Sequence, residues 1–575
     1  MSRTRATAPD GPLTLVVGDD ALAISTAAEI CRLPGHRVTV VGTGGEDFAR
    51  AAVAAGARFV AGRADSQDSL ERANVADAAT IIAVSRNDQL NLHTALMARD
   101  ANPRIRIVLR QFNRTLAHKI EQNLPDCAVL SLAWHSAASY AATALDPSCF
   151  RGLQFPEPDG PLTGFVERLA GDDVARRSVA EVEAELGVRM IAVNGDTAID
   201  RHALVPWGAR LCLYGTIEQL MRSAPKTGSG EKPAPTASVA APRTRTLGRL
   251  IRANPYLWSF AGAGLLLFWL GCWHFHETFH TNWLTAAYFV LSTMTTTGYG
   301  DITPHQDDVI DIFMAMVLMM AGVFFTGVFI AFAASMLTRA QWVRAQGLRR
   351  IKRRGHIVLC GAGSIGSGVI ELLLGLGKPL VVVEAKPDAA MVERARDLGL
   401  DLLTGDASRD DTLDLCNLGG AHSLIALTNF DTLNLEIALG ARARNPSMPI
   451  VLRIADASFA ASIARHFDFR TTYSAAALAA PAFAGLARMP GARGRITIED
   501  QEFAISEYRL RGDADPGPPG AIPIAAAREK TLALIHDLTP LGHDDRVLLL
   551  MPLAQFDDGG AGTEPQVAEL SSAIT

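Results

Sequence analysis

Short apolar runs alternate with helical patterns through the first part of the chain. The runs that predict strands are Leu13–Val17, Arg37–Gly42, Arg58–Val60, Thr80–Val84 and Ile105–Leu109. Between them, apolar residues recur with the period of a helix, as in the segment of about Ala21–Leu33. Strands that alternate with helices predict a parallel sheet with right-handed crossovers.

The same pattern returns in the second half of the chain. His356–Gly361 is a strand running into a turn, and Leu380–Glu384 is the next strand. A shift of 343 positions aligns 62–110 with 405–453 without a gap, and 22 of those 49 positions are identical. The chain therefore carries two copies of one α/β domain. Each is followed by a small segment, 151–222 and 491–555, whose mixed patterns predict an α+β lobe.

Two long apolar segments lie between the copies. Tyr256–Phe275 has no formal charge and is about one bilayer-spanning helix long, and Ile312–Leu337 is long enough to span with tilt. Arginines precede the first segment and a basic run follows the second, whereas His274–Asp311 contains no Lys or Arg. The positive-inside tendency predicts a plasma (inner) membrane protein with both termini and both α/β copies in the cytoplasm.

The stretch before the second span offers a series of oxygen atoms. Thr296 offers a hydroxyl, and Thr296, Thr297, Gly298 and Tyr299 offer backbone carbonyls. Successive carbonyls can point the same way only if alternate residues leave ordinary φ/ψ space, which Gly298 and Gly300 do without a Cβ penalty. A ring of such strands replaces the water shell of a dehydrated cation.

The six residues Thr296-Thr297-Gly298-Tyr299-Gly300-Asp301 resemble the selectivity filter of potassium channels, with Thr297 where Val is usual. The resemblance implies potassium ions bound at Thr296–Tyr299 and a homotetramer in a lipid bilayer, because one strand cannot surround an ion. Gly322 and Gly327 in the second span are candidates for a gating hinge, and close helix packing explains them equally well.

A glycine-rich turn gives the second α/β copy its chemistry. Gly361-Ala362-Gly363-Ser364-Ile365-Gly366 follows a strand and opens a helix, and Glu384 ends the next strand. This arrangement places backbone N–H groups and a helix N-terminus against a pyrophosphate, and a carboxylate against ribose hydroxyls. The glycines alone would also permit close helix–strand packing, which leaves a purely structural interpretation open.

The first copy departs from this pattern. Its turn reads Gly18-Asp19-Asp20-Ala21-Leu22-Ala23, and Val41 or Gly42 stands where Glu384 aligns. Two carboxylates therefore lie where phosphates would bind, and backbone access is lost. We predict that this copy has a degenerate nucleotide site and a structural or regulatory role.

Both copies resemble the RCK (KTN) domain, which regulates potassium channels and Trk/Ktr-type transporters. The resemblance covers about 13–220 and 355–553, and it implies a cytoplasmic ring of eight domains whose ligand-dependent shape moves the pore helices. It also implies NAD(H) or an adenine nucleotide as regulatory ligand. The implied ligand-binding residues are Gly361, Gly363, Ser364, Ile365, Gly366, Glu384, Asp406, Ala407 and Thr428.

The predicted fold is multidomain, with two Rossmann-like α/β RCK domains flanking an all-α two-helix pore module, and each RCK domain carries a small α+β lobe. The expected order is N-terminal RCK domain 1–150, lobe 151–222, flexible linker 223–248, pore module 249–340, linker 341–354, C-terminal RCK domain 355–490, lobe 491–555 and disordered tail 556–575.

Composition limits the alternatives. A net charge of −6 provides no basic field for nucleic acid, and the seven scattered cysteines contain no C-x-x-C pair for zinc or a disulfide framework. His274, His276, Glu277 and His280 cluster in the outer loop, as metal ligands, a pH sensor or simply a solvated loop.

The sequence predicts a potassium-selective channel gated by nucleotide, and not an enzyme. A membrane-anchored, nucleotide-sensing regulatory subunit of a potassium uptake system is the main alternative. An NAD-dependent dehydrogenase would leave the filter and the spans unexplained, and a Trk/Ktr-type transporter needs four pore loops in one chain, of which the sequence shows one.

Overall fold

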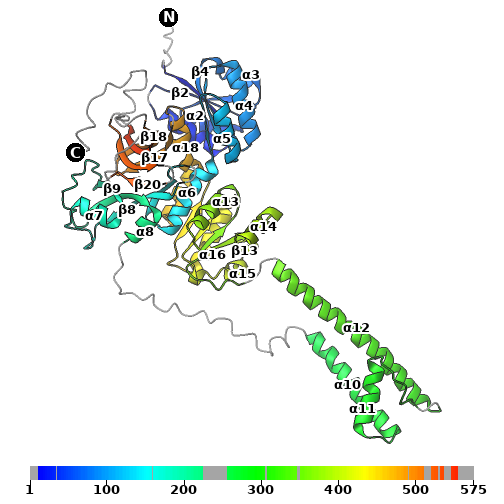
Figure 1. Cartoon of the computed structure of the whole chain (residues 1–575). Helices are drawn as coiled ribbons and strands as arrows, with labels where there is room; N and C mark the ends of the chain where they lie inside the picture. The colour runs from blue at the N-terminus through cyan, green and yellow to red at the C-terminus, as the bar shows by residue number, and fades with distance from the viewer. Residues whose placement is uncertain are drawn as a thin grey trace. The chain divides into compact units, whose positions relative to one another are not determined.

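The computed structural model describes residues 11–33, 35–157, 160–224, 255–304, 307–345, 350–489, 491–510, 520–528, 531–535 and 545–553 (Figure 1). The chain divides into two compact units. One comprises Met1–Pro225 with Arg349–Thr575, and the other is Lys226–Leu348. Most of the expected linker 223–248 and all of the tail 556–575 lie outside the described residues.

The N-terminal α/β copy is a six-stranded parallel sheet in the order β3-β2-β1-β4-β5-β6. Its central strands, Leu13–Val17, Ala78–Ala83 and Arg106–Arg110, are mostly buried and rich in Val, Ile and Leu, as expected where helices cover both faces of a parallel sheet. Its elements are β1 (Leu13–Val17), α1 (Ala21–Cys31), β2 (Arg37–Gly42), α2 (Glu46–Ala54), β3 (Arg58–Ala61), α3 (Gln67–Arg72), β4 (Ala78–Ala83), α4 (Asp88–Ala101), β5 (Arg106–Arg110), α5 (Arg114–Asn123) and β6 (Cys127–Leu130).

The C-terminal copy repeats this topology in the order β13-β12-β11-β14-β15-β16. The strand order reverses between β11 and β14, which is where dinucleotides bind in such sheets. Its elements are β11 (Ile357–Cys360), α13 (Ser364–Gly375), β12 (Leu380–Glu384), α14 (Ala389–Asp397), β13 (Asp401–Thr404), α15 (Asp410–Leu415), β14 (Ser423–Ala426), α16 (Asp431–Arg444), β15 (Ile450–Arg453), α17 (Ala457–Phe467) and β16 (Thr472–Tyr473). The predicted pair of Rossmann-like domains is confirmed.

Each copy is followed by an antiparallel sheet. The first lobe contains β7 (Cys149–Gln154), β8 (Leu162–Leu169), α7 (Val179–Leu186), β9 (Arg189–Val193), β10 (Arg210–Thr216) and α8 (Ile217–Arg222). Ser178 caps α7 in a capping box with Glu181. The described part of the second lobe consists of strands, β17 (Ala492–Ile498), β18 (Gln501–Arg509), β19 (Ile522–Arg528), β20 (Thr531–Leu534) and β21 (Arg546–Pro552).

The two copies exchange a helix, which the sequence did not reveal. Helix α6 (Leu132–Leu145) follows the N-terminal sheet but packs on α13 of the C-terminal copy, and α18 (Ala475–Leu486) packs on α1 of the N-terminal copy (Figure 1). Both helices are largely buried, and α18 is apolar nearly all round, as suits a helix enclosed on several sides. Tyr140 on α6 donates a hydrogen bond to the Tyr473 carbonyl at 3.1 Å. The two copies therefore form one interlocked body.

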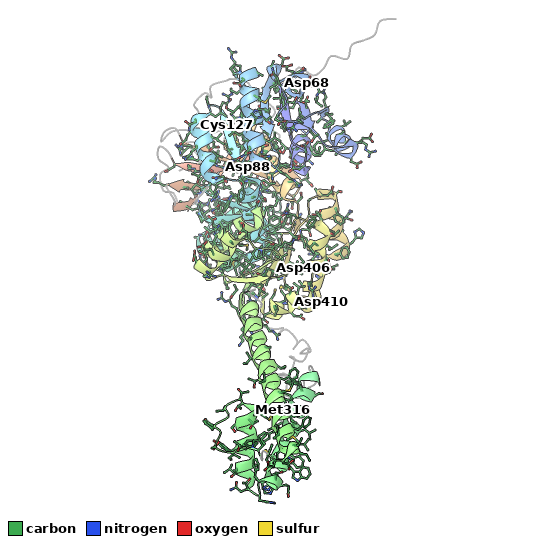
Figure 2. The ribbon with its side chains drawn as sticks, turned by 90° about the vertical axis from the view of Figure 1, so that its right-hand side faces the viewer. Asp68, Asp88, Cys127, Met316, Asp406 and Asp410 are labelled. Atoms are coloured by element: carbon green, nitrogen blue, oxygen red, sulfur yellow. The ribbon has the colours of Figure 1, made fainter. Side chains whose placement is uncertain are left out.

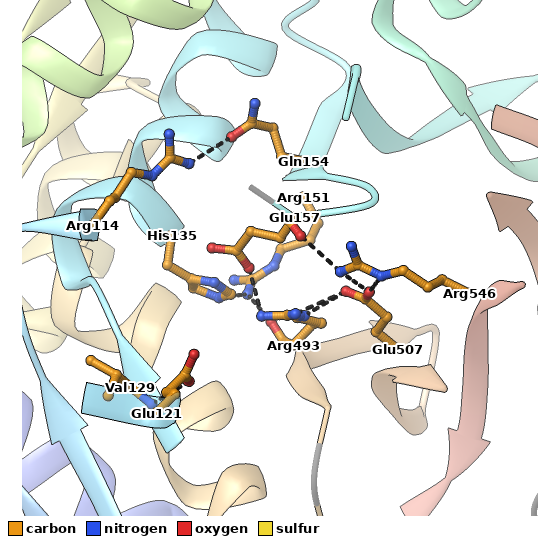
Figure 3. A network of polar contacts seen from close by, with 10 residues as sticks. All are labelled: Arg114, Glu121, Val129, His135, Arg151, Gln154, Glu157, Arg493, Glu507 and Arg546. Carbon is orange, nitrogen blue, oxygen red and sulfur yellow. Dashed lines mark hydrogen bonds and ion pairs between the residues drawn. The ribbon is translucent and has the colours of Figure 1, made fainter. Parts of the chain in front are cut away.

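A buried polar network joins the two lobes (Figure 3). Arg493 on β17 pairs with Glu157 at 2.7 Å and with Glu507 at 2.8 Å. Arg151 on β7 donates to His135 Nε2 at 2.9 Å and to the Leu478 carbonyl at 2.9 Å. Burial lowers the pKa of Arg151 to about 10, and burial together with the neighbouring Arg151 lowers the pKa of His135 well below its usual value. His135 therefore accepts as a neutral imidazole, and the Arg493–Glu157 pair links the second lobe to the first.

The described residues of the second unit form the helices α10 (Pro255–Thr278), α11 (Trp283–Met294) and α12 (Val309–Ala345). Its core is apolar and partly aromatic, with Phe275 packed edge-on against Phe289. Among the described residues, one stretch, Val309–Val328 within α12, is long and apolar enough to cross a membrane, with a mean hydropathy of 2.2. Helix α10 has 24 residues and covers the predicted first span.

Candidate functional site

The segment 295–301 leaves the end of α11 with an alternating backbone. Thr296, Gly298 and Gly300 have positive φ values of 61°, 50° and 75°. The sequence predicted this conformation for the two glycines but not for Thr296, where a Cβ makes the left-handed region costly. A β-branched residue is uncommon in this region, and such strain persists only where the surroundings impose it.

Hydrogen bonds from the end of α11 hold the start of this segment. The backbone N–H groups of Thr297 and Gly298 both donate to the Ser292 carbonyl, at 2.9 and 3.2 Å. The hydroxyl of Thr297 lies 2.9 Å from that of Thr295. The usual Val has no hydroxyl there, so this side-chain contact is specific to Thr297.

Aromatic and acidic groups position the other end of the segment. Tyr288 on α11 donates a hydrogen bond to Asp301 at 2.9 Å, and its ring lies nearly parallel to that of Tyr299, with centroids 6.3 Å apart. The Tyr299 side chain is 70% exposed in the single chain.

The two glycines of α12 differ in their surroundings. A Cβ on Gly322 would come within 2.1 Å of the Met294 carbonyl oxygen, so the helix needs glycine there to approach the end of α11. A Cβ on Gly327 would meet no atom within 4 Å. Close packing accounts for Gly322, whereas a hinge at Gly327 stays a prediction.

The histidines at and after the end of α10 do not form a cluster. His274 on α10 contacts the buried Asp311 of α12 at 2.9 Å, whereas His276 stacks on Trp283. Among the described residues, no group of three or more His, Cys, Asp or Glu side chains is placed to hold a metal ion.

The glycine turn after β11 contains two glycines at which a Cβ would clash and one at which it would not. Gly361 has a φ of 96°, and a Cβ there would lie 2.9 Å from the Thr428 nitrogen. A Cβ on Gly366 would lie 2.2 Å from the Gly361 carbonyl oxygen. Gly363 is the N-cap of α13, and a Cβ there would meet no atom within 4 Å. The chain's own packing therefore explains Gly361 and Gly366 but not Gly363.

A cavity of about 410 Å³ opens beside this turn. Glu384 lies in its wall and accepts a hydrogen bond from the Ala362 N–H at 2.8 Å, so the carboxylate already faces the turn. The same wall contains Lys386, Met391 and Arg394, which the sequence did not predict. Their signal was weak, because they follow Glu384 in a loop and on a helix without a motif.

The other predicted ligand-binding residues lie around the turn. Ser364 and Ile365 form the first turn of α13. Asp406 and Ala407 follow β13, and Asp406 accepts from the Ser408 N–H at 3.0 Å (Figure 2). Thr428 follows β14 and donates its hydroxyl to Asn434 at 2.7 Å. Asp406, Ala407 and Thr428 are not among the residues that line the cavity.

The turn of the N-terminal copy is filled by the chain itself. Asp20 stands at the position of Gly363, and its carboxylate accepts from the N–H groups of Leu22 and Ala23 at 3.0 and 3.4 Å. The other carboxylate oxygen pairs with Arg110 at 3.0 Å and Arg86 at 3.5 Å. These are the helix N-terminal donors and cations that would otherwise bind a phosphate. Asp20 thus takes the place of the ligand.

Comparisons with known proteins agree with this architecture. Residues 14–129 and 357–470 match the TrkA-N domain family, and residues 258–339 match an ion channel family. Potassium channel protein 1 of Methanocaldococcus jannaschii is 28% identical over 179 residues, which cover 30% of this chain and 53% of that protein. The voltage-gated potassium channel Kch of Escherichia coli is 23% identical over 175 residues, which cover 30% of this chain and 42% of that protein.

Among solved structures, the GsuK channel bound to NAD has a TM-score of 0.47 at 15% identity, over 96% of this chain and 80% of that one. The chain spans about half the length of the curated relatives it matches. It carries two TrkA-N (RCK) domains that flank an ion-channel domain. This is the domain set of a two-transmembrane potassium channel with one RCK domain before the pore and one after it.

Proposed function

We propose that the protein is a potassium-selective channel of the cell membrane whose opening is controlled by a nucleotide on its C-terminal RCK domain. The conducting part of the proposal rests on the alternating backbone at Thr296, Gly298 and Gly300. In an extended strand, successive carbonyls point to opposite sides. Where residues alternate between right-handed and left-handed backbone conformations, the carbonyls point to one side. Four such segments in a homotetramer would surround a dehydrated ion with carbonyl oxygens.

The regulatory part rests on Gly363. A glycine in a helix N-cap is usually replaceable, and Ser, Thr, Asp or Asn would stabilise the helix there. The N-terminal copy has made that replacement with Asp20, whereas the C-terminal copy keeps a glycine whose Cβ position is empty. Free N–H donors, open space and Glu384 across the turn suit a pyrophosphate and a ribose. The ligand class is NAD(H) or an adenine nucleotide.

Flux from proteoliposomes tests this function. The purified full chain is expected to conduct potassium in strong preference to sodium, and the potassium flux is expected to change when NAD, NADH, ADP or ATP is added. Equal sodium and potassium fluxes through tetramers would contradict the conducting role. A potassium-selective flux that no nucleotide changes would support the conducting role and contradict the proposed regulation.

The main alternative is a regulatory subunit of a potassium uptake system, anchored by a vestigial pore. Such a subunit has no reason to keep a threonine in the left-handed region at Thr296, since loss of conduction would release the strain. The same flux experiment separates the two functions, because the subunit alone would carry no current.

We expect one dinucleotide to bind per chain, on the C-terminal copy. Asp20 already occupies the helix donors of the N-terminal copy and repels a phosphate. Separate domains are unsuitable for this measurement, because α6 and α18 pack on the opposite copy and would be left exposed. Calorimetric titration of the full chain gives the stoichiometry directly. Two equivalent sites per chain would show that a ligand can displace the Asp20 carboxylate from the N-terminus of α1.

A further inference from the structure

An aromatic side chain stands exposed beside the nucleotide site. Phe430 lies in the loop between β14 and α16, and its side chain is 68% exposed. One exposed apolar side chain is common on a protein surface, and the comparison with the N-terminal copy is what gives this one its meaning. Within the described chain, Phe430 belongs to none of the hydrophobic clusters.

The N-terminal copy provides an internal control, because Asn87 occupies the same position 343 residues earlier. The side chain of Asn87 caps α4 by accepting from the N–H groups of Gln89 and Leu90 at 3.0 and 3.2 Å. Phe430 is the N-cap residue of α16 and makes no side-chain cap. The C-terminal copy therefore lacks a favourable cap and exposes a ring instead.

The backbone of the two loops is held in the same way. Asn434 donates to the carbonyls of Thr428 and Arg453 at 3.1 and 2.8 Å. Its counterpart Asn91 donates to the carbonyls of Ser85 and Arg110 at 2.9 and 3.0 Å. The two loops therefore share one backbone arrangement, and the copies differ here in the side chain, Phe430 in place of Asn87. A different loop conformation does not explain the exposed ring.

The position of Phe430 relative to the strand reversal suggests what covers it. In a sheet of this order, a dinucleotide crosses the reversal point at the carboxyl ends of the strands. Its pyrophosphate lies at the first helix, and its two nucleotide halves lie on either side of that point. The cavity wall contains Glu384 and Lys386, on the β12 side. Phe430 follows β14 on the other side, two residues after Thr428, whose nitrogen is next to Gly361.

We propose that Phe430 is the stacking platform for the second heteroaromatic ring of a dinucleotide, and that it makes the C-terminal site select dinucleotides over mononucleotides. This inference rests on the proposed nucleotide site at Gly363. One ring and its ribose occupy the cavity beside Glu384, the pyrophosphate lies on the N-terminus of α13, and the nicotinamide ring lies on Phe430. A mononucleotide such as ADP leaves the phenyl ring uncovered.

Titration of the full chain with NAD, ADP-ribose and ADP tests the platform. In Phe430→Ala the affinity for NAD is expected to fall about tenfold, within the range of ring stacking on an aromatic side chain. The affinities for ADP-ribose and ADP are expected to stay unchanged, because neither ligand has the second ring. Phe430→Trp is expected to retain NAD binding.

Two further variants separate ligand binding from folding. Phe430→Asn copies Asn87, so it is expected to raise the midpoint of thermal unfolding through a new cap while weakening NAD binding. Asn87→Ala removes the cap of α4 and is expected to lower the unfolding midpoint while leaving NAD binding intact. A variant that gains stability and loses NAD affinity cannot be explained by misfolding.

Three results would overturn the inference. Equal NAD affinity in wild type and Phe430→Ala would contradict the stacking role of Phe430 without contradicting the proposed regulatory site. Loss of tetramers in Phe430→Ala with unchanged NAD affinity would assign the ring to a contact between chains. Failure of all three nucleotides to bind the wild type would remove the proposed regulation and the platform with it.

Discussion

A channel with Gly363→Val is expected to lose its response to nucleotide while it remains selective for potassium. A Cβ at this position meets no atom of the chain within 4 Å, so the folded domain accepts the substitution. The branched side chain instead fills the space through which a pyrophosphate approaches the N-terminus of α13. A coupling free energy of about 1–3 kcal/mol is typical of allosteric ligands, so its loss removes a severalfold change in open probability.

Flux from proteoliposomes with and without nucleotide measures the response, and calorimetry measures binding. Gly375→Ala is the matched control, because Gly375 ends the same helix and its Cβ position is also open. That variant is expected to respond as the wild type does. A Gly363→Val channel that still binds and responds fully would place the regulatory ligand elsewhere in the molecule.

The repeat and the parallel sheets were predictable because their signals are local. Buried strands of a parallel sheet read as continuous apolar runs, and β1, β2 and β11 are such runs. The exchange of α6 and α18 was not predictable. Residues such as Ala137 and Ala479 are fully buried, and an apolar pattern reveals that a face is covered without revealing which copy covers it.

The candidate site likewise has some features that the sequence predicts and others that it does not. The glycine turn and Glu384 could be predicted because phosphate binding dictates both residue type and spacing. The ion pairs of Asp20 with Arg110 and Arg86 join segments far apart in sequence, and only the fold brings them together. Phe430 was visible in the alignment of the two copies as a change from Asn87, but its meaning depends on exposure, which a sequence does not give.

Gly298→Ala is expected to abolish potassium selectivity or conduction altogether. Gly298 has a φ of 50°, and a Cβ there would meet no atom within 4 Å, so the harm comes from the backbone and not from crowding. Holding a non-glycine residue in the left-handed region costs about 1–2 kcal/mol. In the proposed tetramer the cost would apply four times, roughly 4–8 kcal/mol in all, and it would fall on a segment that already holds Thr296 in the same region.

The ratio of potassium to sodium flux measures the effect. Gly262→Ala is the matched control, because Gly262 lies in α10, its Cβ position is equally open and its φ is not positive. Alanine favours a helix, so this control is expected to conduct with unchanged selectivity. If Gly298→Ala kept the wild-type flux ratio, the alternating backbone would not be the filter. The carbonyls that replace the water shell would then have to come from another part of the chain.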